Sequence, residues 1–341
     1  MNNQLSIAIK IPTFNVQATI LQTIRSLLNQ TYQNFIIYIY DNCSTDSTLA
    51  ILRELNDGRI VIATADENLG WKWNFDRCLK NEGHPLTLFA HADDIYHPYF
   101  IETNATLLSE YKNVSLLFSK GSYFSDIGEI SNSFYAAKQP PVVSVYDSYN
   151  ELLKELAMRG NFIFCPSAFG WSEIFYSVIH EFRETDFGGS ADLDAWLRVA
   201  KNHAIAVIES PTIFYYRISA NQISEQDRGL KAGSVFVKCM SAHLKSVPVD
   251  KSSYQKDVTY LIRWHELFHA VVSDIKCSIS TSDMRINSRF AYNITELIKL
   301  RGIPVRRNLM LAALIFLVEV ATLLPRELQK KFVMMLLRSS R

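Results

Sequence analysis

The stretch PLTLFAHADDIYHP (85–98) sets two consecutive carboxylates, Asp93 and Asp94, directly after an apolar run that predicts a buried strand. Ionised acids that are buried without partners destabilise a fold by several kcal/mol. Such a pair is therefore expected at an exposed strand end, on a cation or in a turn. Which of the three applies decides whether this region carries chemistry.

Several runs early in the chain predict strands that are apolar on both faces, which is typical of parallel strands covered by helices. The segments between them predict helices, because the apolar residues of 20–28 share one helical face and 44–55 opens with capping residues. The strand candidates are LSIAIKI (5–11), FIIYIYD (35–41), RIVIATA (59–65) and LTLFAHA (86–92). This alternation predicts an α/β fold with a Rossmann-like, mostly parallel sheet flanked by helices.

Each strand candidate is followed by a polar or turn-forming segment. These segments are PTFN (12–15), DNCSTD (41–46), DENLG (66–70) and HADD (91–94). Because the carboxyl ends of parallel strands meet at one edge of a sheet, the four segments are expected to converge on one crevice. A nucleotide is the ligand that such a crevice most often binds.

The motifs by which dehydrogenases and P-loop proteins bind phosphates are missing. A dinucleotide-binding turn requires GxGxxG so that the backbone can approach pyrophosphate closely, and 12–15 contains no glycine. The charge of a diphosphate must then be met by another group. A divalent cation, Mn²⁺ or Mg²⁺, held by Asp93 and Asp94 would do so.

Composition narrows the cellular setting. The chain has 341 residues, 48% of them hydrophobic, and a formal net charge of +1, which gives no argument for nucleic acid binding. Its five cysteines form no CxxC pair, as expected in a reducing compartment. No secretory signal is visible at the N-terminus. These features predict a cytoplasmic protein.

Four segments together resemble the family 2 glycosyltransferases of bacterial polysaccharide synthesis, which have the GT-A fold. The segments are IPTFN (11–15), SLLNQTYQNFIIYIYDNCSTDST (26–48), ENLGWKWN (67–74) and AHADDIYHP (90–98), in the family's order and spacing. The resemblance covers roughly residues 5–220. It implies an enzyme that moves a sugar from a nucleotide-diphosphate sugar to a hydroxyl of a glycan or lipid-linked acceptor, with inversion at the anomeric carbon.

The resemblance also assigns roles to single residues. Asp41 would hydrogen-bond the nucleobase, with UDP favoured over dTDP and GDP, and Asp93 would be the principal metal ligand beside Asp94. The residues expected to contact the nucleotide are Pro12, Thr13, Asn15, Asp41, Asn68, Gly70 and Asp93. His91 stands where an aspartate is commoner in the family.

The segment GGSADLDAWLRVAK (188–201) predicts an amphipathic helix over 192–201 and resembles the family's Glu-Asp segment, which supplies the catalytic base. An inverting transfer needs a carboxylate that deprotonates the attacking hydroxyl. The match assigns this role to Asp192 and puts Ala191 where a glutamate is usual. Asp194 falls elsewhere on the helix.

The segment YYRISANQIS (215–224) resembles the part of the family that follows the last core strand and often supplies a metal-binding histidine. Ser219 occupies that position in this chain, and Arg217 could instead meet the diphosphate charge.

Taken singly, each of these acids also has a structural interpretation. Asp93 and Asp94 could cap a helix, Asp41 could close an Asx-type turn, and Asp192 could be an N-cap. The departures at His91, Ala191 and Ser219 also leave open a non-catalytic protein of the same fold that binds nucleotide-sugars or glycans.

We expect a GT-A domain over 1–222 and a helical region over 223–341. Within the first, 126–146 reads as a loop and 204–217 as a strand. Within the second, His265-Glu266-x-x-His269 matches the zincin pattern. A zinc protease would need a third ligand, for which Asp274, Asp283 and Glu296 are the candidates.

The end of the chain suggests where the protein acts. Residues 309–324 are mostly apolar, but these 16 residues fall short of the ~20 that span a bilayer, and Glu319 interrupts them. The flanking basic residues are Arg306, Arg307, Arg326, Lys330 and Lys331. The segment 306–341 could lie on anionic lipid at the inner face of the cell membrane, or pack on its own domain or on a second subunit of a homo-oligomer.

Overall fold

The structure is a computed structural model that describes residues 5–130, 140–218 and 232–247. Its contacts divide the chain into two compact units. The first comprises Met1–Leu152 and Arg159–Ala220, and the second Leu153–Met158 and Asn221–Arg341. The boundary at residue 222 that the sequence suggests remains a prediction.

The first unit is built on an eight-stranded, mostly parallel sheet in the order β3-β2-β1-β4-β9-β6-β10-β8. Strands β3, β2, β1 and β4 run parallel to one another. The strands are β1 Ile7–Thr13, β2 Phe35–Asp41, β3 Ile60–Thr64, β4 Leu86–Phe89, β6 Val114–Ser119, β8 Val142–Tyr146, β9 Ala168–Trp171 and β10 Ala204–Ser210. The predicted α/β class with a parallel sheet is confirmed.

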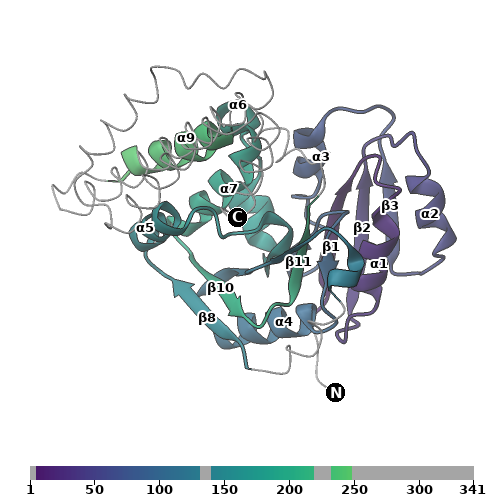
Figure 1. The fold of residues 1–341 in the computed structure, drawn as a ribbon, viewed down its shortest axis with the longest axis horizontal. Coiled ribbons are helices and arrows are strands. Elements are labelled where there is room, and N and C mark those ends of the chain that lie inside the picture. Colours follow the sequence, from purple (N-terminus) through teal and green to yellow (C-terminus); the bar gives the residue numbers. More distant parts are fainter. Residues whose placement is uncertain (1–4, 131–139, 219–231, 248–341) are drawn as a thin grey trace, which may run out of the picture. The chain divides into compact units, whose positions relative to one another are not determined.

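Helices flank the sheet, and Figure 1 shows α1 and α2 beside the neighbouring strands β1, β2 and β3. Helix α1 buries Ile20, Ile24 and Leu27 completely, and each such side chain stabilises the fold by roughly 2 kcal/mol. The helices of the first unit are α1 Ile20–Leu28, α2 Thr48–Glu54, α3 Trp71–Arg77, α4 Phe100–Glu110, α6 Glu184–Phe187 and α7 Ala191–Ala200. Helix α5, Tyr149–Arg159, is divided between the units, because Leu153–Met158 belong to the second. Shorter turns are 3-10 at Ile127–Glu129, Cys165–Ser167 and Gly188–Ser190, and π-helical at Ile174–Ile179.

Two strand boundaries differ from the prediction in a way that affects the site. Strand β1 continues through Pro12 and Thr13, because these residues pair with Tyr40 and Asp41 of β2. Strand β4 ends at Phe89, although the Ala90 N–H still donates to the Lys10 carbonyl at 2.9 Å. The acidic loop therefore begins directly after the strand.

The segment 126–146, expected to be a loop, ends in β8, which runs antiparallel to β10 at the edge of the sheet. The prolines at 140 and 141 precede this strand and hide its pattern, since proline is tolerated at strand starts and edges. The expected strand over 204–217 is divided at Pro211 into β10 and β11, Phe214–Arg217.

A second, three-stranded sheet has the order β5-β11-β7. It consists of β5, Ile95–Tyr96, β11, and β7, Ser122–Phe124. The antiparallel pairing of Tyr215 with Ile95 brings the end of β11 to the loop that carries Asp93 and Asp94.

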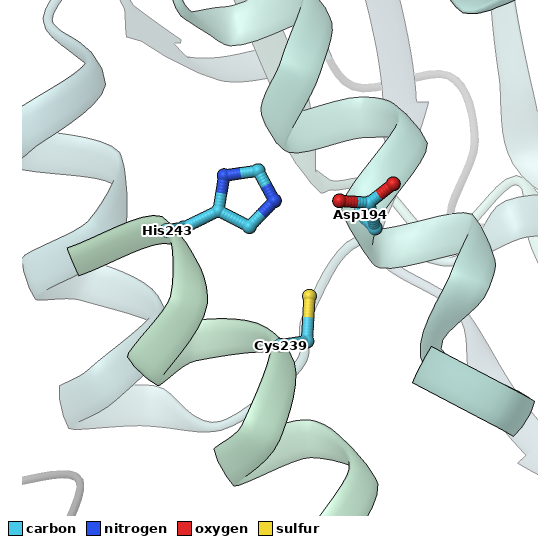
Figure 2. Close-up of side chains that lie close together, drawn as sticks. All are labelled: Asp194, Cys239 and His243. Atoms are coloured by element: carbon cyan, nitrogen blue, oxygen red, sulfur yellow. The ribbon is translucent and has the colours of Figure 1, made fainter. Parts of the chain in front are cut away.

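The second unit is described over Leu153–Met158 of α5 and over 232–247, which contains α9, Ala232–Lys245. Cys239 and His243 are both buried, and they project from the same side of this helix, one turn apart (Figure 2). None of the helices in the described residues is long and apolar enough to cross a membrane. The zincin pattern at 265–269 and the basic, apolar segment 306–341 lie outside the described residues.

Candidate active site

The ends of the parallel strands lie level with one another. Thr13 at the end of β1 pairs with Asp41 at the end of β2, which in turn pairs with Thr64 at the end of β3. Beyond them the Asn42 N–H donates to the Thr13 carbonyl at 2.9 Å. The predicted nucleotide-contacting residues Pro12, Thr13 and Asp41 are therefore brought together, with Pro12 and Thr13 buried in the strand itself.

Asp41 closes the turn that follows β2. Its carboxylate is fully buried, and Oδ2 accepts the Ser44 N–H at 3.0 Å while Oδ1 accepts the Ser44 hydroxyl. Cys43 in the same turn has a left-handed φ of 63°. Asp41 therefore has a structural role in this turn, but its carboxylate bonds the third residue on, whereas the Asx-type turn of the alternative interpretation bonds the second. A contact between Asp41 and a nucleobase remains a prediction.

Asn15 connects the loop after β1 to the loop after β2. Its N–H donates to the Ser44 hydroxyl at 2.9 Å, and its Oδ1 accepts the Thr45 N–H at 2.8 Å. Asn15 has a φ of 50°, a left-handed conformation that asparagine tolerates better than most residues. The side chain thus fixes the shape of this edge of the crevice.

Asn42 fixes the third loop, which carries the predicted residues Asn68 and Gly70. Its Nδ2 donates to the Asn68 Oδ1 at 2.7 Å and to the Gly70 carbonyl at 3.1 Å, while its Oδ1 accepts the Leu69 N–H at 3.2 Å. Gly70 has a φ of 86°, which favours glycine at the start of α3. Sequence reasoning missed Asn42, although its place directly after the strand acid was a usable signal.

Two further residues that the motifs did not single out hold the strand ends from α3. The buried Asn74 donates from Nδ2 to the Tyr40 carbonyl at 2.8 Å and to the Thr13 carbonyl at 3.2 Å. Arg77 donates to the Asp41 carbonyl at 3.0 Å and to the Ala63 carbonyl at 2.7 Å. These bonds satisfy backbone carbonyl groups at the ends of β1, β2 and β3.

The acidic loop after β4 gathers three groups that can bind a metal. One ligand atom each from His91, Asp93 and Asp94 lies within 4.8 Å of the others. Asp94 is fully buried, and its Oδ1 accepts the Arg217 N–H at 2.8 Å. Its Oδ2 and the His91 Nε2 are buried and have no hydrogen-bond partner among the residues that the structure describes. These oxygen and nitrogen atoms form a donor set that fits a divalent cation.

Burial controls the protonation of this loop. It raises the pKa of Asp94 well above its ordinary value, the neighbouring charge of Asp93 raises it further, and Arg217 opposes both. Burial also lowers the pKa of His91 to about 4, against the opposing effect of Asp93. His91 is therefore a neutral imidazole at physiological pH, the form in which histidine binds metals.

Arg217 holds the acidic loop in place. Its Nε donates to the Asp93 carbonyl at 2.7 Å, and its Nη2 donates to the Gln22 Oε1 of α1 at 2.6 Å. The guanidinium also lies 4.5 Å from the centre of the Phe124 ring. These contacts favour a role in fixing the loop over the direct contact with a diphosphate that the sequence suggested. Ser219, the other residue expected there, lies outside the described residues.

Asp192 is the second residue of α7, and the N-cap position is occupied by Ser190. The interpretation of Asp192 as an N-cap is therefore wrong. The side chain is half-buried, and its Oδ1 accepts the Leu193 N–H at 2.7 Å. Burial raises the pKa of Asp192 to about 6. A carboxyl group with this pKa suits a general base that works near neutral pH.

Asp194 also lies on α7 (Figure 2) but, unlike Asp192, it forms ion pairs with residues that the structure describes. Its buried carboxylate makes a bidentate ion pair with Arg183, in which the Arg183 Nε lies 2.8 Å from Oδ2 and Nη2 contacts Oδ1. The Arg198 Nε lies 3.1 Å from Oδ2. Two arginines hold this carboxylate, and Asp192 is therefore the better candidate for the base.

The chain is similar in sequence to known proteins. The sequence model described as Glycosyl transferase family 2 matches residues 8–171. Among curated proteins, the Escherichia coli UDP-Glc:alpha-D-GlcNAc-diphosphoundecaprenol beta-1,3-glucosyltransferase WfgD is 25% identical over 219 residues, which are 64% of this chain and 79% of that protein.

Solved structures share the fold. The crystal structure of S. aureus TarS 1-349 in complex with UDP-GlcNAc has a TM-score of 0.57 at 15% identity, over 93% of this chain and 88% of that one. The mannosyltransferase PcManGT from Pyrobaculum calidifontis, in complex with GDP-Man and Mn2+, has a TM-score of 0.56 at 11% identity, over 94% and 88% of the two chains. The fold is that of GT-A glycosyltransferases.

Proposed function

Because this chain is a family 2 glycosyltransferase, we propose that it transfers a sugar, with inversion, from a nucleotide-diphosphate sugar to a hydroxyl group of a glycan or lipid-linked acceptor. One observation carries the proposal. The level ends of β1, β2 and β3 and the loop of Asp93 and Asp94 after β4 form one edge of the sheet, where ligands bind in folds of this kind.

The donor nucleotide would occupy this edge, in contact with Pro12, Thr13, Asn15, Asp41, Asn68, Gly70 and Asp93. UDP is the favoured nucleotide. WfgD is named for UDP-Glc, and the TarS structure contains UDP-GlcNAc. The hydrogen bonds from Asn15 and Asn42 support the assignment, because they hold the loops between which a nucleoside would lie.

Asp93 and Asp94 would hold Mn²⁺ or Mg²⁺ beside the donor diphosphate. The bound cation would supply positive charge to the leaving nucleoside diphosphate. The unpartnered Oδ2 of Asp94 supports this assignment, since a fully buried carboxylate oxygen requires a cation or a hydrogen bond. The Mn2+ complex of PcManGT supports it from a protein of the same fold.

Asp192 would act as the general base. As the acceptor oxygen attacks the anomeric carbon, the new carbon–oxygen bond forms, the bond from that carbon to the diphosphate breaks, and the hydroxyl proton passes to Asp192. Its raised pKa of about 6 still leaves the carboxylate ionised at neutral pH. The ion pairs of Asp194 support this choice, because they occupy the alternative acid.

The acceptor is proposed to be a lipid-linked glycan of polysaccharide synthesis, reached at the cytoplasmic face of the membrane. WfgD is named for a diphosphoundecaprenol-linked acceptor. The segment 306–341 would bind the lipid surface. A chain ending at residue 305 is then expected to bind anionic vesicles more weakly than the full chain, and equal binding would contradict this part of the proposal.

The function is tested by titrating UDP, GDP and dTDP into the full chain by calorimetry, with and without Mn²⁺. We expect UDP to bind in a metal-dependent manner and Asp93→Ala to lose that dependence. Asp192→Asn should retain UDP binding and lose transfer to an acceptor. If no nucleotide binds, the proposal fails. If the Asp192→Asn variant transfers sugar as the wild type does, the assignment of the base fails.

A further inference from the structure

The loop after β4 places an imidazole beside its two carboxylates, and this has a chemical consequence. His91 lies two residues before Asp93, so the loop offers a ring nitrogen as well as carboxylate oxygens. A ring nitrogen of His91 and one oxygen each of Asp93 and Asp94 lie within 4.8 Å of one another. Three ligand atoms at this separation can bind the same ion.

Packing explains the position of the His91 ring but not its nitrogen. The ring centre lies 5.4 Å from that of Phe75 and 6.1 Å from that of Phe89, so a phenylalanine would fill the same space. The Nε2 atom is nevertheless buried without a hydrogen-bond partner among the described residues. Leaving a buried polar atom unpaired destabilises a protein. A bound cation would give this nitrogen a partner.

The same argument applies to the neighbouring carboxylate. Asp94 is fully buried, its Oδ1 is satisfied by the Arg217 N–H at 2.8 Å, and its Oδ2 has no partner among the described residues. Two buried atoms that can each offer a lone pair, one nitrogen and one oxygen, are thus left in one loop without partners among the described residues. A transition-metal ion can satisfy both.

Resting on the proposed function, we infer that a ring nitrogen of His91 is a third ligand of the donor-site cation, beside Asp93 and Asp94. Imidazole suits transition-metal ions, whereas Mg²⁺ prefers oxygen ligands and gives up its waters reluctantly. The nitrogen should therefore make the site select Mn²⁺ and Co²⁺ over Mg²⁺ more strongly than an all-carboxylate loop does. The histidine at position 91 is the residue that would give this chain its metal selectivity.

The direct test is pulsed electron paramagnetic resonance on the full chain loaded with Mn²⁺ and UDP. Wild type should show coupling between Mn²⁺ and a nitrogen-14 nucleus, and His91→Phe should lose it, because that substitution keeps the ring and removes the nitrogens. Thermal unfolding with circular dichroism verifies that the variant is folded. Bound Mn²⁺ without nitrogen coupling in the wild type would overturn the inference, and this measurement needs no variant.

Metal selectivity gives a second, independent measurement. Calorimetric titration of Mn²⁺ and of Mg²⁺ in the presence of UDP should give a ratio of affinities that falls by roughly tenfold in His91→Asp, since a carboxylate replaces the nitrogen ligand. An unchanged ratio would overturn the inference.

The two proposals fail in different ways. If wild type binds Mn²⁺ in a manner that depends on Asp93 but shows no nitrogen coupling, His91 is a packing residue and the proposed function stands. If wild type binds neither UDP nor Mn²⁺, the proposed function fails and this inference fails with it.

Discussion

The guanidinium Nε of Arg217 lies 2.7 Å from the carbonyl oxygen of Asp93, a residue 124 positions earlier in the chain. The backbone N–H of the same arginine donates to the Asp94 carboxylate at 2.8 Å. One residue at the end of β11 therefore holds both acids of the candidate metal site. The loop has little regular structure of its own, so its geometry depends on these bonds.

Substitution of Arg217 by glutamine should weaken metal binding before it affects the fold. The variant loses the bonds to Asp93 and Gln22 but keeps the backbone bond to Asp94. We expect the Mn²⁺ concentration for half-maximal activity to rise by about tenfold, as is typical when a residue that orients metal ligands is removed. Arg25→Gln, an exposed position on α1, is the matched control. Equal Mn²⁺ dependence in the two variants would contradict this role.

The raised pKa of Asp192, about 6, predicts the acid limb of the pH profile. A general base must be ionised to accept a proton, so kcat/KM should fall about tenfold per pH unit below pH 6. Asp192→Asn should lose about a thousandfold in kcat. Asp186→Asn, an exposed acid on α6, should keep wild-type activity. A profile flat to pH 5 would exclude Asp192 as the base.

The same pKa gives an independent prediction for stability. The folded-state pKa of Asp192 lies above the ordinary 3.8, so the folded state binds the proton more tightly than the unfolded state. Stability from this group is therefore present at low pH and is lost as pH rises from about 4 to about 6. At pH 7, Asp192→Asn should melt at or above the wild-type temperature, and the difference should vanish at pH 4. A variant that melts below wild type at pH 7 would assign Asp192 a structural role.

The sequence predicted the elements whose patterns are local. Strand β2 lies at the predicted 35–41, and α7 begins one residue before the predicted 192. The apolar run of β2 and the amphipathic spacing of α7 are each sufficient to define the element. The polar segments after β1 and β2 lie at one edge of the sheet, as parallel pairing requires.

The remaining features depend on contacts between distant segments. Strand β9 runs antiparallel between β4 and β6, and no local pattern indicates this insertion. The strands of the small sheet have two to four residues, too few for a period to be visible. The bonds from Asn74 and Arg77 to strand-end carbonyls arise only once α3 has packed on the sheet. Such long-range contacts cannot be read from residue spacing.

Substitution of Asn42 by alanine should weaken donor binding more than it lowers kcat. It donates to Asn68 and Gly70 and accepts from Leu69, so Asn42→Ala releases the loop that would line the nucleotide cleft. We expect the donor KM to rise by roughly five- to tenfold with kcat changed less, because uniform binding is lost. Initial rates at varied donor concentration measure this.

Asn81→Ala is the matched control for Asn42, since its side chain caps a turn that lies before the start of β4. It should leave the donor KM unchanged. A fall in kcat of Asn42→Ala at constant donor KM would contradict the proposed place of the 68–70 loop.

Substitutions of the two acids of α7 should have different effects: that of Asp194 on the free energy of unfolding, and that of Asp192 on activity. Asp194 is fully buried between Arg183 and Arg198, and removing one member of a buried ion pair costs about 3–5 kcal/mol. Arg198 also donates to the Ile179 carbonyl at 2.8 Å and contacts the Glu181 carbonyl, so Asp194 anchors the segment that leads into α7. Asp194→Ala should therefore lower the free energy of unfolding by several kcal/mol in urea denaturation.

A double-mutant cycle tests whether this loss arises from the ion pair. Asp194→Ala and Arg183→Gln together should cost less than the sum of the single changes, because each single change already removes their shared ion pair. Asp192→Ala should lose activity with little change in unfolding free energy at pH 7, since its half-buried carboxylate pairs with no arginine among the residues the structure describes. If Asp194→Ala is as stable as wild type while transfer is abolished, the base is Asp194 and the assignment of Asp192 is wrong.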